Sequence, residues 1–173
     1  MDVSDPEHPK PGKPELFLRT PPFLEREPAY SPDGRWIAYA SNESGPFEVY
    51  VRPGGVHSGS VKWRISTGGG RSPLWSRNGR ELFYKSLDNQ IMVSTYTAKS
   101  GSFAADKQRT WSNTQILDPG PGAQWSLDLA PDGTRFAVFP RPDATAEQKG
   151  SVHVTVLLNF FDELRRRVPV GGK

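Results

Sequence analysis

The chain has 173 residues, of which 35% are hydrophobic and 11% aromatic, and its formal net charge is +3. It contains no cysteine, which excludes disulfides, thiolate metal sites and cysteine nucleophiles. Gly and Pro occur 17 times each, which argues against a helical bundle or coiled coil and favours short strands joined by turns.

The distribution of charged and apolar residues limits the partners that we expect. The only basic run is Arg165–Arg167, and acids and bases alternate elsewhere, so no nucleic-acid partner is expected. The longest apolar run, Val154–Leu158, is far too short to span ~30 Å of hydrocarbon, so no membrane span is expected. Residues 1–13 are charged and proline-rich, which predicts a flexible leader without a signal peptide.

A glycine-turn motif occurs three times along the chain. It reads Ser-Pro-Asp-Gly from residue 31, Ser-Arg-Asn-Gly from residue 76 and Ala-Pro-Asp-Gly from residue 130. Asp-Gly and Asn-Gly are strong hairpin signals, because glycine adopts positive φ without a Cβ clash. The spacings are 45 and 54 residues, and the first matches the ~40–45 residues of a four-stranded propeller blade.

The motifs predict an all-β chain of antiparallel, four-stranded propeller blades. An additional strand is expected before the first motif, over residues 15–20, and the third unit lacks a fourth strand. The expected blades cover about 28–67, 73–118 and 125–158. Within them, second strands are expected at 36–40, 81–85 and 135–139, third strands at 47–52, 90–96 and 152–158, and fourth strands at 62–66 and about 110–117.

The uneven strand count predicts how the blades close. A circular propeller completes one blade with strands from both ends of the chain, which removes the unpaired sheet edge. Three blades do not close well alone, whereas two copies supply six, so we expect a homodimer. Residues 159–168 are expected to form a short α-helix, capped by Asn159 with acids in its first turn and bases in its last.

The first repeat, SPDGRWIAYAS, resembles the TolB-like propeller repeat, the Pro-Asp-Gly relative of WD repeats, and the resemblance extends over residues 14–161. The segments EREPAYSPDGRWIAYASNESGPFEVYVRP and VLLNFFDELRRRVP resemble the C-terminal half of propellers fused to bacterial serine/threonine kinases. No kinase motif is present in the chain. The resemblance implies half of a six-bladed propeller, with an extracytoplasmic sensor role in the kinase-fused relatives and docking to envelope proteins in the TolB-like ones. It leaves the compartment of this chain open.

Several residues precede the predicted inner strands, where a propeller places them near the mouth of its central channel. Ligands often bind there, although rim salt bridges are an alternative reading of the same residues. Trp125 follows a Gly-Pro-Gly segment and is expected on an exposed loop. The candidate ligand-binding residues are Glu25, Arg26, Glu27, Arg71 and Trp125.

The turn residues Asp33, Asn78 and Asp132 recur at equivalent positions, so their oxygens could bind Ca²⁺. The alternative is that each side chain accepts hydrogen bonds within its own turn, and no Asp-x-Asp-x-Asp-Gly loop favours the metal. We therefore expect no cofactor and no metal.

No catalytic residue is predicted, because the chain has no Gly-x-Ser-x-Gly elbow and no evident acid to orient His57 beside Ser58. The expected function is a non-enzymatic interaction or sensor module that binds a protein or a small ligand. The alternative is a hydrolase, with a metal-dependent site in the channel or with the chain as the propeller of a prolyl-oligopeptidase-like enzyme.

Overall fold

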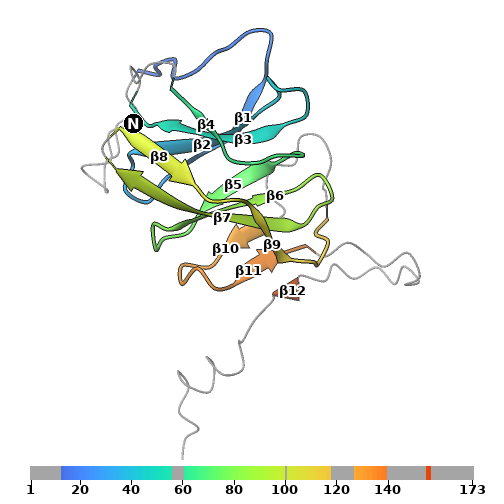
Figure 1. Cartoon of the computed structure of the whole chain (residues 1–173). Helices are drawn as coiled ribbons and strands as arrows, with labels where there is room; N and C mark the ends of the chain where they lie inside the picture. The colour runs from blue at the N-terminus through green and yellow to red at the C-terminus, as the bar shows by residue number, and fades with distance from the viewer. Residues whose placement is uncertain (1–12, 56–60, 100, 118–126, 140–154, 157–173) are drawn as a thin grey trace, which may run out of the picture.

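The computed structural model describes residues 13–55, 61–99, 101–117, 127–139 and 155–156. Within these ranges all regular structure is β, and every strand pair is antiparallel, which confirms the predicted all-β class. The strands form three sheets that follow one another along the chain and lie in a row (Figure 1). No helix in the described ranges is long and apolar enough to cross a membrane.

The first sheet is a meander with the strand order β1-β2-β3-β4. Its turn forms as the sequence predicts, because Ser31 N–H donates to the Trp36 carbonyl at 2.8 Å and Gly34 adopts a φ of 69°. The predicted second and third strands agree closely with the structure, and the fourth is shorter than predicted. The strands are β1 (Glu25–Tyr30), β2 (Trp36–Ser41), β3 (Glu48–Pro53) and β4 (Trp63–Arg64).

The second sheet contains a strand that the sequence did not reveal. The first part of β7 pairs with β9 and its last part pairs with β8, so β7 belongs to two hairpins. The additional strand β8 lies within the longer, 54-residue interval between motifs. The strands are β5 (Arg71–Trp75), β6 (Glu81–Lys85), β7 (Ile91–Lys99), β8 (Ser102–Ala105) and β9 (Arg109–Ser112).

The third sheet consists of β10 (Leu127–Leu129), β11 (Phe136–Val138) and β12 (Thr155–Val156), in that order. These strands fall within the blade predicted over 125–158. The predicted leader up to residue 12, the helix over 159–168 and Trp125 lie outside the described residues.

The strand expected over residues 15–20 is wrong, because this segment forms no strand. A strand needs an edge to pair with, and the predicted partner is the third sheet, at the opposite end of the row (Figure 1). The segment instead packs Phe17 and Leu18 against the outer face of the first sheet, where Ile37, Tyr39 and Tyr50 form an apolar cluster.

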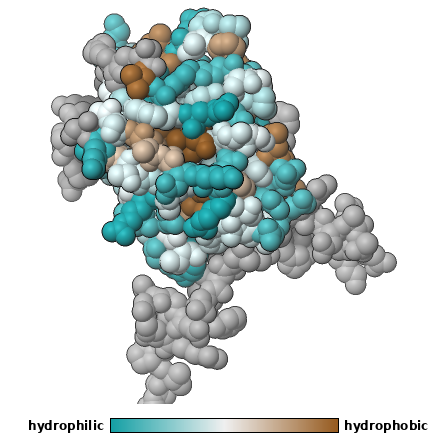
Figure 2. Space-filling model, in the orientation of Figure 1, coloured by the Kyte–Doolittle hydropathy of each residue, from teal (hydrophilic) through white to brown (hydrophobic). Residues whose placement is uncertain are grey.

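The core lies between neighbouring sheets. Phe103 of β8 occupies the interface of the first two sheets, with ring centroids 5.3 Å from Trp36 and 5.0 Å from Tyr96. A second cluster, which includes Phe83 and Phe136 at 5.0 Å, joins the second and third sheets. The sheets therefore pack face to face, as successive blades would. On the face that Figure 2 shows, hydrophobic residues form patches separated by hydrophilic ones.

Candidate ligand-binding site at the start of the inner strands

Strands β1 and β5 begin in the same unusual conformation. β1 pairs with β2 and β5 pairs with β6, and a β-bulge interrupts each pairing. The bulge lies between Arg26 and Ala29 in β1 and between Arg71 and Leu74 in β5. Glu27 and Ser72, 45 residues apart, have φ values of 56° and 53° and each precedes a proline. Positive φ at a residue other than glycine costs roughly 1–3 kcal/mol and persists only where the surroundings hold it.

The Glu27 side chain crosses from the first sheet to the second. Its carboxylate accepts a hydrogen bond of 2.6 Å from the Ser72 backbone N–H and pairs with Arg71 Nη2 at 3.1 Å. The Ser72 hydroxyl lies 3.4 Å from the same carboxylate. The bulge turns the Ser72 N–H toward the neighbouring sheet, so the strained backbone is compensated by an intersheet bond to a charged acceptor.

Phe47, in the connection between β2 and β3, lies under two guanidinium groups. The Cζ atom of Arg71 is 5.1 Å from the ring centroid and that of Arg26 is 5.7 Å away. Both distances are within the range of cation–π attraction. Arg26 is exposed and, among the residues that the structure describes, has no ion pair.

A buried carboxylate fixes the connection that leads into Arg71. Glu48 is 3% exposed, and its Oε1 accepts the backbone N–H groups of Gly68 and Gly69 at 3.0 Å each. The Ser66 hydroxyl donates to the other carboxylate oxygen. Gly70 N–H then donates to the Phe47 carbonyl at 2.7 Å, so the loop that carries Arg71 is tied to the loop that carries Phe47.

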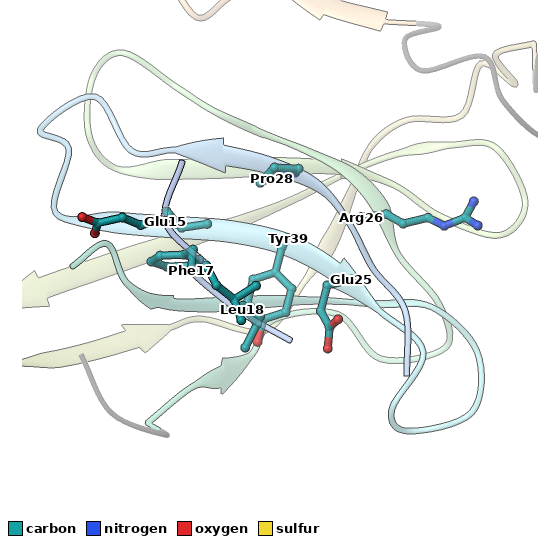
Figure 3. A pocket seen from close by; sticks show the side chains of 9 residues that line it. Glu15, Phe17, Leu18, Glu25, Arg26, Pro28 and Tyr39 are labelled. Atoms are coloured by element: carbon teal, nitrogen blue, oxygen red, sulfur yellow. The ribbon is translucent and has the colours of Figure 1, made fainter. Parts of the chain in front are cut away.

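A pocket of about 250 Å³ lies beside this cluster, between residues 15–18 and the first sheet. In Figure 3, Glu25 lies beside Tyr39 in this pocket; Arg26 also lines the pocket, and its guanidinium extends away from the Tyr39 side chain. Burial raises the pKa of Tyr39 to about 12, so its hydroxyl stays protonated at neutral pH. The pocket is otherwise mainly apolar, with a lining that includes Leu16, Phe17, Leu18, Pro28 and Ile37.

The structure thus brings together three of the predicted site residues, Arg26, Glu27 and Arg71, and directs Glu25 to the neighbouring pocket. Sequence reasoning missed Ser72 and Phe47. Alignment of the repeats at the 45-residue spacing would have paired Ser72 with Glu27. No sequence signal marks Phe47, because the connection between β2 and β3 supplies it.

The repeated turn residues use their oxygens within their own turns. Asp33 accepts hydrogen bonds from Ser31 Oγ at 2.6 Å and Arg35 Nε at 2.7 Å. Asn78 and Asp132 each accept the backbone N–H two residues later, at 2.8 and 2.9 Å. Among the described residues, no group of three or more metal-ligating side chains occurs.

These hydrogen bonds also affect the acidity of the two turn carboxyl groups. The Ser31 hydroxyl, and then Arg35, lower the pKa of Asp33 to about 2. The backbone N–H of Thr134 lowers the pKa of Asp132 in the same direction. Both turns therefore hold an ionised carboxylate at neutral pH.

Comparison with known proteins finds similarity to solved structures. No family model matches the chain, and no curated protein matches it. A solved structure described as "putative TolB" from Agrobacterium tumefaciens is similar with a TM-score of 0.35 and 24% sequence identity. The match covers 50% of this chain and 34% of that protein, so the chain matches about a third of its length.

Proposed function

We propose that this chain is a non-enzymatic binding module made of three propeller blades, and that two copies form a six-bladed ring. The observation that carries the proposal is the shared position of Arg26 and Arg71. They lie one repeat apart, at the start of consecutive inner strands, and both cover Phe47. A ring brings such repeated positions together around one channel mouth.

The packing of the sheets supports a second copy. The second sheet is covered on both faces by apolar clusters, as expected of a blade inside a ring. The outer face of the first sheet is covered by Phe17 and Leu18, and a pocket of about 250 Å³ stays open beside them. Leu16, at 74% exposed, lines the same pocket. A blade from a partner would pack beside Phe17 and Leu18 and close this pocket.

The binding chemistry follows from the cluster at the start of β1 and β5. It offers two guanidinium groups, an aromatic ring and a carboxylate within one surface, which suits recognition of a polar or charged group on a protein or a small ligand. A docking or sensor role requires a rigid surface of this kind, and Glu48 holds the loops that build it.

Light scattering after size-exclusion chromatography tests the ring. We expect a mass of about twice the 19.2 kDa of one chain, independent of loading concentration above the dissociation constant. A cooperatively folded monomer would overturn the ring. Hydrolysis of a generic ester or lactone that a chelator abolishes would instead favour the alternative of a metal-dependent hydrolase.

A further inference from the structure

Arg71 and Ser72 form a receptor for a carboxylate, and Glu27 fills it. The receptor has two principal donors, a guanidinium N–H at 3.1 Å and a backbone N–H at 2.6 Å, with the Ser72 hydroxyl at 3.4 Å. The backbone donor is available because the bulge and the positive φ of 53° at Ser72 direct it out of the strand. The occupant comes from the preceding sheet, 45 residues earlier in the sequence.

Arg26 and Glu27 repeat the same local structure one sheet earlier. The Arg26 position is followed by a bulge, the φ of Glu27 is 56°, and a proline comes next, as after Ser72. The Glu27 backbone N–H therefore corresponds to the Ser72 N–H. The Arg26 guanidinium lies 5.7 Å from the centroid of the Phe47 ring, against 5.1 Å for Arg71, and it has no carboxylate partner among the described residues.

The repeat register says what the proposed ring would place next to Arg26. In the ring, the third blade of the partner copy precedes the first blade. The residue four positions before the third motif is Ser126, as Glu27 is four positions before the first. Ser126 lies outside the described residues, but as a serine it carries no carboxylate, so the equivalent position does not supply the group that Glu27 supplies to Arg71.

We propose that Arg26, together with the Glu27 backbone N–H, binds a carboxylate group of an external ligand. This inference rests on the proposed binding function and names the chemical class of its ligand. The planar guanidinium and one N–H offer donors for the two oxygens of a carboxylate, as the Arg71 receptor does for Glu27. Phe47 supports the guanidinium from below, and Arg71 already neutralises the nearby Glu27 carboxylate.

The test titrates the full chain with succinate while the arginine Nε–H and backbone amide signals are followed by NMR. Succinamide is the neutral control, inorganic phosphate tests for general attraction of anions, and N-acetyl-alanyl-alanine with its amide tests a peptide carboxyl terminus. We expect succinate to shift the Arg26 and Glu27 signals, and Arg26→Gln to weaken its binding by about tenfold or more. Tighter binding of the acetylated peptide than of succinate would identify a peptide terminus as the source of the carboxylate, and the reverse order a small acid.

Arg77→Gln is the matched control, because Arg77 is also an exposed arginine but lies in the β5–β6 turn, at the other end of β5. We expect this variant to bind succinate as the unchanged protein does. Equal effects of Arg26→Gln and Arg77→Gln, or phosphate binding as tight as succinate binding, would overturn the proposal.

A second variant tests the receptor without removing an arginine. Glu27→Gly places at this position a residue that adopts positive φ readily. It also removes the carboxylate that fills the receptor formed by Arg71 and Ser72. Acetate should then raise the melting temperature of Glu27→Gly more than that of the unchanged protein, with chloride as the salt control. An equal response of both proteins would show that this arrangement does not bind free carboxylates.

The mass in solution separates this inference from the proposed function. A dimer that fails to bind succinate would leave the ring standing and reject the Arg26 receptor. A monomer that binds succinate through Arg26 would reject the ring and keep the receptor.

Discussion

Glu27 and Arg71 lie 44 residues apart in the sequence and join the first sheet to the second through an ion pair of 3.1 Å. Their side chains are 13% and 32% exposed, so the pair is only partly screened by solvent. The ion pair connects β1 and β5, which each contain a bulge near their start, so this one contact belongs both to the packing of the two sheets and to the candidate site.

Glu27→Gln should therefore destabilise the fold. The amide oxygen still accepts the Ser72 N–H, but Arg71 loses its charged partner, which costs about 1–2 kcal/mol for a partly buried pair. Urea unfolding followed by tryptophan fluorescence measures the difference. Arg109→Gln is the control, since the Arg109–Glu81 pair is long, at 4.0 Å, and Arg109 is 60% exposed. If Glu27→Gln lowers the free energy of unfolding no more than Arg109→Gln does, the Glu27 charge does not stabilise the fold.

Two equivalent serines should respond differently to alanine. The Ser31 hydroxyl donates to Asp33 at 2.6 Å and accepts the Trp36 N–H at 3.0 Å. The Ser76 hydroxyl at the same position of the second repeat is buried and has no hydrogen-bond partner among the described residues. We expect Ser31→Ala to lower the free energy of unfolding by about 1–2 kcal/mol and Ser76→Ala to leave it nearly unchanged. Equal losses would contradict this difference between the two turns.

The Asp33 turn should make stability depend on pH in acid. The folded pKa of about 2 lies below the ordinary 3.8, so unfolding takes up a proton in this window. The contribution of Asp33 is complete above about pH 4 and is lost as the pH falls towards 2. Because the carboxylate is 44% exposed, solvent screening limits the effect to about 0.5–1 kcal/mol. Unfolding of Asp33→Asn should be less dependent on pH between 4 and 2, and an unchanged slope would refute the assignment.

Phe103 should be one of the most sensitive core positions. Its ring contacts Trp36, Trp63, Trp75 and Tyr96, with centroid distances of 5.0 to 6.1 Å. Phe103→Ala should cost about 3–5 kcal/mol, because it leaves a cavity between two sheets. Leu87→Ala, at a side chain that is 56% exposed, is the control. A small loss at Phe103 would mean that the first two sheets pack mainly through other residues.

The sequence predicted what depends on neighbouring residues. The Gly34, Gly79 and Gly133 turns form, with φ between 69° and 72°, because each needs only a local backbone conformation. The strand over residues 15–20 was wrong because strand pairing depends on an edge far away in the sequence. β8 was missed because its single large apolar side chain, Phe103, gives little periodicity, and the long repeat interval was its only sign.

The sequence predicted the place of the candidate-site residues in the chain but not their partners. Arg26, Glu27 and Arg71 could be expected just before the first strand of each repeat, because the repeat fixes their place in the chain, and the structure places them in the first residues of β1 and β5. The partner of each could not, since Phe47 comes from a loop between two other strands and Ser72 meets Glu27 only after the sheets pack. Side-chain pairing across sheets depends on tertiary geometry, which a repeat spacing does not contain.

The two intersheet contacts differ in how firmly they set the position of one sheet on the next. Between the first and second sheets, Trp75 Nε1 donates to the Ala29 carbonyl at 2.9 Å, and Gln108 exchanges two hydrogen bonds with the Thr67 backbone. Directional bonds of this kind hold only one alignment. Between the second and third sheets, the described side chains meet through an apolar cluster, and one backbone hydrogen bond of 2.7 Å runs from the Leu117 N–H to the Phe139 carbonyl. Among the described residues, the alignment of the first two sheets is therefore fixed mainly by bonds that side chains make, and that of the second and third by apolar packing around a backbone bond.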